Sequence, residues 1–264
     1  MTLAATPAAP VRRRLPPLST VASRIVQQMN EADTDLPALA RLIELDPALT
    51  LAVLRLVNSS FYGLPRQVGT VNEAIMVLGM TTVRRVAIAS AISHPLKNLD
   101  LKRSLVDAMW RKAIGGAVLA SRLLDGHAAG QLAFTAGVLQ DLGRLDLYLR
   151  APTDYVALEN LSGAALCAAE KERFGQTHAE AGAELADLWA LPAAIVEAIA
   201  EHHQPAEHPP TNPAAQAVWL ASLIGDRDLG QASMPHLAHI NVDPAQALAA
   251  AQREIDALCA LVGV

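Results

Sequence analysis

Apolar positions along the chain recur every three or four residues, in segments separated by residues that begin or end helices. No segment keeps the alternation of apolar and polar positions that marks a half-buried strand. In the first third of the chain, Ser, Thr, Asp and Pro precede the apolar segments, where their side chains or missing amides suit a first helical turn. The pattern predicts short helices over residues 21–29, 36–45, 48–58, 71–78 and 81–93.

Longer helices are predicted from residue 101 onwards. One covers 101–124 and ends at Gly126, and another covers 131–149 and ends before Pro152. Further helices are predicted over 153–160, 164–174, 177–189, 192–203, 213–224 and 244–262.

This change from short to long helices suggests two lobes. The sequence predicts an all-α chain in which a flexible arm, 1–14, precedes a small N-terminal helical subdomain, 15–98. A larger helical subdomain, 99–264, follows, and the two join at Pro95 to Asp100. The expected architecture is a two-lobed helical bundle.

Composition agrees with helices and narrows the functional classes. Hydrophobic residues make up 52% of the chain and aromatic residues only 3%, which is typical of Ala- and Leu-rich helices rather than of strands. The formal net charge of -5 argues against a protein that binds nucleic acid through a large positive field. The two cysteines, Cys167 and Cys259, are too few for a disulfide scaffold and are expected to be reduced.

No export signal or membrane span is expected. Arg12 to Arg14 follow a small, neutral start rather than precede it, which is the wrong order for a secretory signal. The longest apolar stretch without charge, 86–96, is shorter than the roughly 20 residues that a bilayer requires. We therefore expect a cytoplasmic protein without membrane insertion.

The candidate chemistry lies in the second half of the chain, at Asp141, His178, His202 and His203. Imidazole and carboxylate groups from separate helices can meet inside a bundle and hold a divalent metal. Two adjacent histidines cannot share one helix face, but Pro205 indicates that the helix ends at the pair. The alternative is that the pair interacts with the helix dipole and the last carbonyls.

Several blocks of the sequence occur together in one order. They are Leu15 to Leu18, Asp46 to Leu49, Leu54 to Ser59, Phe61 to Gly63, Ala74 to Gly79, Gly137 to Leu145, Glu170 to Phe174 with His178 and Gly182, Trp189 to Pro192, and His202-His203. In this order the blocks resemble the HDOD family, the HD-related output domain of bacteria. The resemblance implies an all-helical signalling or regulatory module related to the HD metal-dependent phosphohydrolases.

The same resemblance implies that the hydrolytic site is degenerate. At the positions where HD hydrolases carry a His, a His-Asp pair and a later Asp, this sequence has Lys112, Gln140-Asp141 and Ser222. Only Asp141 keeps the ligand type, and an ammonium at Lys112 repels a divalent ion. The expected local contact is an ion pair between Lys112 and Asp141.

An enzymatic alternative remains open. His178, His202 and His203 match additional ligands of the related HD-GYP phosphodiesterases, so Asp141 and these three could form a partial metal site. Gln204-Pro205-Ala206-Glu207 stands where Gly-Tyr-Pro should follow the His pair, which weakens a phosphodiesterase assignment. Catalysis would need both a held metal and an activated water.

A second alternative is a helix-turn-helix DNA-binding regulator near 36–58. Its reading helix would carry Arg55 as a single base-reading side chain among apolar residues, whereas major-groove readers need several donors. The pattern favours a helix that packs in the core.

The sequence thus favours a non-catalytic regulatory module that binds another signalling protein and no specific nucleic acid, with input or output domains on a separate polypeptide. No cofactor is expected, and regulation is expected at the junction of the two lobes. A vestigial pocket could take a small ligand, and its predicted residues are Lys112, Gln140, Asp141, His178, His202, His203 and Ser222.

Overall fold

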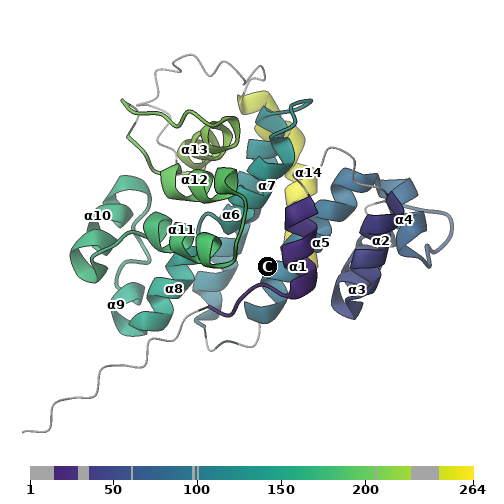
Figure 1. Cartoon of the computed structure of the whole chain (residues 1–264), viewed down its shortest axis with the longest axis horizontal. Helices are drawn as coiled ribbons and strands as arrows, with labels where there is room; N and C mark the ends of the chain where they lie inside the picture. The colour runs from purple at the N-terminus through teal and green to yellow at the C-terminus, as the bar shows by residue number, and fades with distance from the viewer. Residues whose placement is uncertain are drawn as a thin grey trace, which may run out of the picture.

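The structure is a computed structural model that describes residues 15–28, 36–60, 62–96, 99, 101–205, 207–226 and 244–264. All regular secondary structure in these residues is helical, which confirms the all-α prediction (Figure 1). The predicted arm, 1–14, and residues 97, 98 and 100 of the predicted connection between the lobes lie outside the described residues. The helices are α1 (Thr20–Gln27), α2 (Leu36–Glu44), α3 (Pro47–Val57), α4 (Val71–Leu78), α5 (Met80–Leu96), α6 (Arg103–Leu123), α7 (Gly130–Leu139), α8 (Leu142–Arg150), α9 (Pro152–Val156), α10 (Gly163–Phe174), α11 (His178–Leu188), α12 (Ala193–Glu201), α13 (Pro213–Gly225) and α14 (Pro244–Val262).

The short helices of the first part begin where their capping residues predict. The Asp46 carboxylate accepts a hydrogen bond from the Ala48 amide at 2.9 Å, and the Thr70 hydroxyl accepts one from the Glu73 amide at 3.1 Å. Helix α3 buries Leu49, Val53, Leu56 and Val57, so it packs in the core as the sequence favours. Helix α5 continues past its predicted end at residue 93 and includes Pro95 in its last turn.

Helix α6 is the central element of the second part. It packs against α7, α13 and α14. The α6–α7 contact is close because Gly137 has no side chain: a Cβ atom there would lie 2.5 Å from the Cα of Ala117. These contacts bring α7 and α13 to one side of α6, where the polar side chains described below meet.

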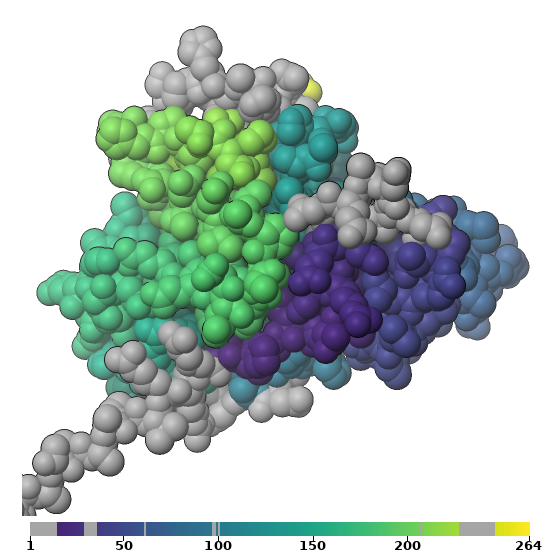
Figure 2. Space-filling model, in the orientation of Figure 1, coloured from purple at the N-terminus to yellow at the C-terminus, as the bar shows by residue number. Residues whose placement is uncertain are grey.

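The last helix lies against both predicted lobes. Helix α14 contacts α6 and also α5 and α3, and one large core includes most buried apolar residues of both lobes. A smaller, separate cluster in the second lobe contains Leu105, Leu147, Tyr148, Tyr155 and Ala181. On the visible face the two parts form an unbroken surface (Figure 2). A boundary at residue 99 therefore stays a prediction. Within the described residues, no helix combines the length and apolarity that crossing a bilayer requires.

The predicted single helix over 131–149 is wrong. The chain forms two helices, α7 and α8, that are separated at Gln140 and Asp141, and Asp141 has a non-helical backbone with φ -94° and ψ 1°. The break redirects the chain, since α7 packs on α6, α12 and α13 whereas α8 packs on α9 and α11. The apolar period continues across the break, so it does not reveal the bend.

Candidate polar site in the second lobe

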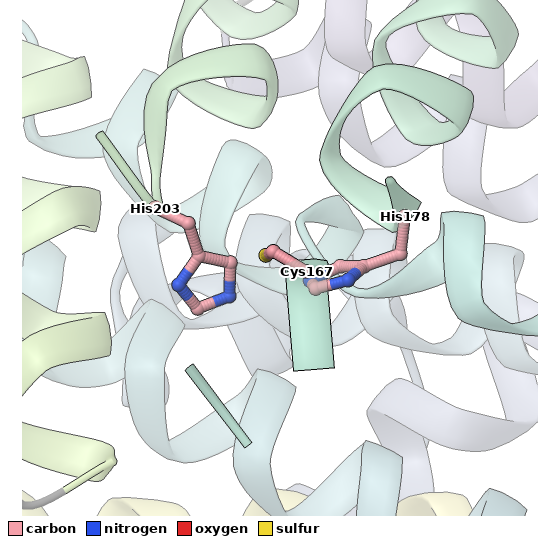
Figure 3. Close-up of side chains that lie close together, drawn as sticks. All are labelled: Cys167, His178 and His203. Atoms are coloured by element: carbon pink, nitrogen blue, oxygen red, sulfur yellow. The ribbon is translucent and has the colours of Figure 1, made fainter. Parts of the chain in front are cut away.

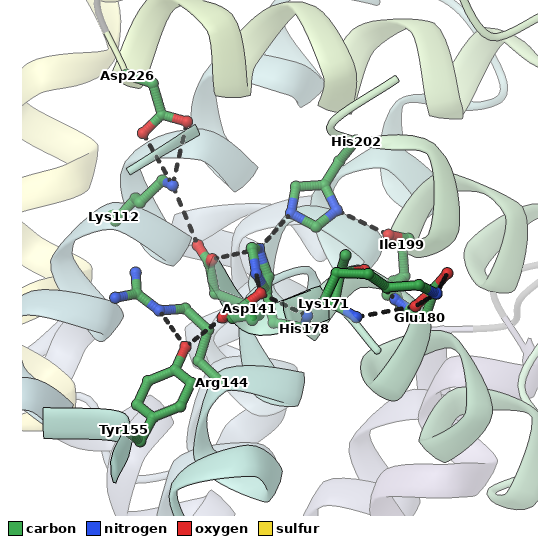
Figure 4. A network of polar contacts seen from close by, with 12 residues as sticks. Lys112, Asp141, Arg144, Tyr155, Lys171, His178, Glu180, Ile199, His202 and Asp226 are labelled. Atoms are coloured by element: carbon green, nitrogen blue, oxygen red, sulfur yellow. Dashed lines mark hydrogen bonds and ion pairs between the residues drawn. The ribbon is translucent and has the colours of Figure 1, made fainter. Parts of the chain in front are cut away.

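The bend between α7 and α8 places Asp141 at the centre of a buried polar cluster (Figure 4). Its carboxylate lies 3.5 Å from the Nε2 atom of His178 and 3.9 Å from the Nζ atom of Lys112. Among the described residues, neither carboxylate oxygen has a hydrogen-bond partner, although the residue is fully buried. The charge of Asp141 is therefore balanced by ionic neighbours rather than by hydrogen bonds.

His178 is held in one orientation by a carboxylate behind it. It begins α11 after Thr177, which forms a capping box with Glu180. Glu170, on α10, lies 2.6 Å from the ring Nδ1 atom and accepts a hydrogen bond from the His178 amide at 2.8 Å. Since a carboxylate accepts, Nδ1 carries the hydrogen and Nε2 faces Asp141.

Glu170 is itself fixed by a buried chain of hydrogen bonds. The Tyr155 hydroxyl donates to Glu170 at 2.6 Å, and the Arg144 Nε–H donates to the Tyr155 oxygen at 3.2 Å (Figure 4). Burial would raise the pKa of Glu170, but its bonds to His178 and Tyr155 outweigh burial and lower it. The carboxylate is therefore ionised and serves as a fixed acceptor for His178.

His202 faces His178 with the same kind of support. It caps the C-terminus of α12, and its Nδ1 atom lies 2.7 Å from the Ile199 carbonyl oxygen. The Nε2 atoms of His202 and His178 are 3.2 Å apart. Burial, together with His178, lowers the pKa of His202 to about 3, so this ring is neutral. A hydrogen or a cation must lie between the two Nε2 atoms, because two lone pairs would repel.

His203 and Cys167 also lie close to His178 (Figure 3). One ligand atom each from Cys167, His178 and His203 lie within 4.8 Å of one another. Burial, with Glu170 nearby, raises the pKa of the Cys167 thiol to about 12, and burial also lowers the pKa of His203. Both groups are therefore neutral, and the thiol lacks the thiolate form that binds metals well.

Lys112 reaches the cluster from α6, and its nearest partner is a residue outside the predicted set. Its ammonium lies 3.0 Å from Asp226, at the end of α13, and 3.9 Å from Asp141. Burial would lower the pKa of Lys112, but Asp141 and Asp226 together raise it. Burial likewise opposes ionisation of Asp141, whose pKa is nevertheless lowered by Lys112 and Arg144. The ammonium and the Asp141 carboxylate are therefore charged.

Gln140 and Ser222, the other two predicted pocket residues, bond to each other. The Ser222 hydroxyl donates to the Gln140 side-chain oxygen at 3.0 Å, and both residues are buried. The structure thus brings Lys112, Asp141, His178, His202 and His203 together, and it joins Gln140 to Ser222 in a neighbouring pair.

The cluster does not fit the metal of an HD hydrolase. Asp141, His178 and His202 offer three ligand atoms within 4.8 Å of one another. At the remaining HD positions, however, an ammonium and the Gln140–Ser222 pair replace ligands. Asp141 and the histidines instead form a polar network in which Lys112 supplies a cation.

A cavity of about 480 Å³ opens beside the cluster. Lys112 and Arg144 contribute to its wall, together with Lys102, which pairs with Glu159. The cavity places two cations of the polar network within reach of a small molecule, and a volume of this size is typical of ligand pockets.

Comparison with known proteins gives one family. A model of the HDOD domain matches residues 15–205. An uncharacterized protein of Treponema pallidum (strain Nichols) is 26% identical over 200 residues, which cover 72% of this chain and 37% of that protein. The chain thus matches well under half the length of this curated relative.

Several solved structures share the fold. A Shewanella amazonensis SB2B structure described as a "Putative phosphohydrolase" has 26% identity and a TM-score of 0.70, and covers 94% of this chain and 95% of that chain. A Marinobacter aquaeolei VT8 structure described as a "Putative signal transduction protein" has 24% identity and a TM-score of 0.72, with 96% of this chain and 61% of that chain covered.

Proposed function

The chain belongs to the HDOD family, and from that premise we propose that it is a non-catalytic regulatory module that works by binding another signalling protein. Family membership supports the regulatory role. The observation that carries the loss of catalysis is the position of Lys112, whose ammonium lies between Asp141 and Asp226.

An ammonium at this point opposes a metal for an electrostatic reason. Two unit charges about 4 Å apart interact by roughly 4 kcal/mol at an effective dielectric constant of about 20, so a divalent ion is repelled by roughly 8 kcal/mol. Lys112 also supplies the positive charge that Asp141 and Asp226 need. A metal ion would have to displace a cation that already balances both carboxylates.

Metal content tests this proposal directly. The purified protein is expected to contain well under one equivalent of iron, manganese or zinc by elemental analysis. Lys112→Gln, which removes the ammonium but keeps a polar side chain, is expected to take up more metal than the natural chain. Lys171→Gln is the matched control, since Lys171 pairs with Glu180 at an exposed position. Stoichiometric metal in the natural protein, lost in His178→Ala, would overturn the proposal.

The protein-binding part needs a separate experiment. The whole chain is used as bait in native cytosol, the captured protein is identified by mass spectrometry, and the complex is rebuilt from two purified components. We expect a complex of defined stoichiometry without turnover of phosphoesters. Failure of every captured candidate to bind in purified form would contradict this part of the proposal.

The second candidate function is a metal-dependent phosphohydrolase. The facing Nε2 atoms of His178 and His202, with Asp141 beside them, are the specific observation in its favour. Each ring is oriented through Nδ1 by an acceptor, as is typical of metal-binding histidines. Metal analysis decides between the two functions, and phosphatase assays follow only if metal is present.

A further inference from the structure

A cavity of about 610 Å³ lies apart from the histidine cluster. It lies where the two predicted lobes meet, and α3, α5, α6, α7 and α14 all contribute to its wall. Helix α14 packs against both α5 and α6, and Figure 1 draws it beside α5. A ligand in this cavity would touch both lobes at once.

Three guanidinium groups line this cavity: Arg85 on α5, Arg122 on α6 and Arg253 on α14. One carboxylate, that of Glu254, accepts hydrogen bonds from both Arg85 and Arg122, the latter at 2.9 Å. Asp125 is the other acidic residue in the wall. Three cations therefore face two anions, and the cavity carries an excess of positive charge.

Arg85 is fixed before any ligand arrives. It bonds to Glu254 and to the hydroxyl of Ser121, and its guanidinium lies 5.1 Å from the centre of the buried Phe134 ring. Only 12% of its side chain is exposed. A guanidinium held from three sides loses little freedom on binding an anion, and its planar fork suits carboxylate and phosphate groups.

Arg253 differs from Arg85 because it is exposed and, within the described residues, has no recorded hydrogen bond or ion pair. Leu56, Ala257 and Leu258 add an apolar side to the same cavity. A molecule that fits would carry an anionic group toward the arginines and a short apolar portion toward the leucines.

We propose that this junction cavity binds a small organic anion, a phosphate or carboxylate with an apolar portion, and that Glu254 occupies the anion position in its absence. The geometry supports this exchange because Glu254 already uses a carboxylate to bridge Arg85 and Arg122. An incoming anion competes with Glu254, and since that residue is on α14, binding alters a contact that joins α14 to α5 and α6. The site is independent of the proposed loss of catalysis.

Calorimetry on the whole protein at low ionic strength tests the proposal with three probes. Phenyl phosphate and benzoate carry the two anion types on the same ring, and benzyl alcohol is the neutral control. We expect at least one anion to bind ten times or more tightly than benzyl alcohol, and the tighter of the two identifies the anion class. Equal binding of all three probes would overturn the proposal.

Two substitutions locate the binding and give opposite results. Arg253→Gln removes an exposed cation without disturbing a recorded contact, so the protein should fold and bind the anion about tenfold more weakly. Glu254→Gln removes the competing charge and should bind it several-fold more tightly. The matched controls are Arg55→Gln and Glu172→Gln, which change the same charges at exposed positions outside the cavity wall.

The controls distinguish anion binding in this cavity from a general effect of the protein's net charge on anion affinity. Changes of equal size in Glu254→Gln and Glu172→Gln would contradict competition by Glu254. Unchanged affinity in Arg253→Gln would place the anion outside this cavity and overturn the proposal, whatever the result for Glu254→Gln.

Discussion

At the scale of single residues, Glu170 holds the polar network together although it does not face Lys112. It accepts hydrogen bonds from Tyr155, from the His178 amide and from the His178 ring. Removal of this carboxylate leaves three buried donors without their acceptor, which costs roughly 1–3 kcal/mol for each unpaired group. The position of His178 thus depends on a residue eight positions earlier in the chain.

The first prediction concerns acid stability. The pKa of Glu170 in the folded state is below its ordinary value of 4.5. The ionised carboxylate therefore stabilises the folded state fully above pH 4.5, and this stabilisation is lost as the pH falls through the folded-state pKa. The pKa of Asp141 is also lowered in the folded state. We expect the free energy of unfolding to fall steeply below about pH 4.5.

Urea unfolding at a series of pH values measures this dependence. Glu170→Gln should be less stable at pH 7 and should show a shallower decline in acid. Glu172→Gln changes an exposed acidic residue on the same helix and serves as the control. Parallel pH curves for the natural protein and Glu170→Gln would contradict the prediction.

Some residues of the cluster belong to a sequence motif, and the sequence could identify these. It could not identify the side chains that contact them. Asp141, His178 and the His pair stand in blocks that can be compared with a family. Asp226 is 114 residues from Lys112, and it becomes its nearest partner only because α13 packs on α6. Cys167 lies in an apolar helical pattern, which gives no sign that its thiol faces two histidines.

At the scale of elements, the capping residues made most helices predictable. The limits of α4 and α14 agree with the predicted ranges, and most others differ by one to three residues. The sequence does not indicate the bend at Gln140 and Asp141, because its cause is tertiary: α8 turns toward α11, where the Gly143 backbone touches that of His178. No local breaker such as proline occurs between α7 and α8.

The second prediction follows from this contact. A Cβ atom at position 143 would lie 1.9 Å from the carbonyl oxygen of His178, and backbone cannot move aside as a flexible side chain can. Gly143→Ala is expected to lower the free energy of unfolding by about 3 kcal/mol or more, in the range of severe packing substitutions. Gly225→Ala is the control, since a Cβ there meets nothing within 4 Å. Similar thermal unfolding of the two variants would show that the predicted collision is relieved.

At the scale of the whole molecule, the position of the buried core says more about how the two predicted lobes are joined than the change from short to long helices does. The sequence suggests two lobes, because short helices give way to long ones near residue 99. The structure places α14 against α3, α5 and α6, so the end of the chain covers helices of both predicted lobes. The sequence pattern cannot reveal that α14 packs on the first lobe, because an apolar helix face does not identify the helices that it contacts.

The third prediction is that the two lobes unfold together. Chains of this length often divide into domains that unfold separately, but here one large core includes buried residues of both lobes and Leu258 of α14. We expect a single transition in scanning calorimetry. Leu258→Ala should lower the free energy of unfolding by about 2–5 kcal/mol, whereas Leu248→Ala, on the same helix but 40% exposed, should cost under about 1 kcal/mol. Two separate transitions in the natural protein would show instead that the lobes are independent domains, and a regulatory partner would then sense their relative position through a flexible junction rather than through a shared core.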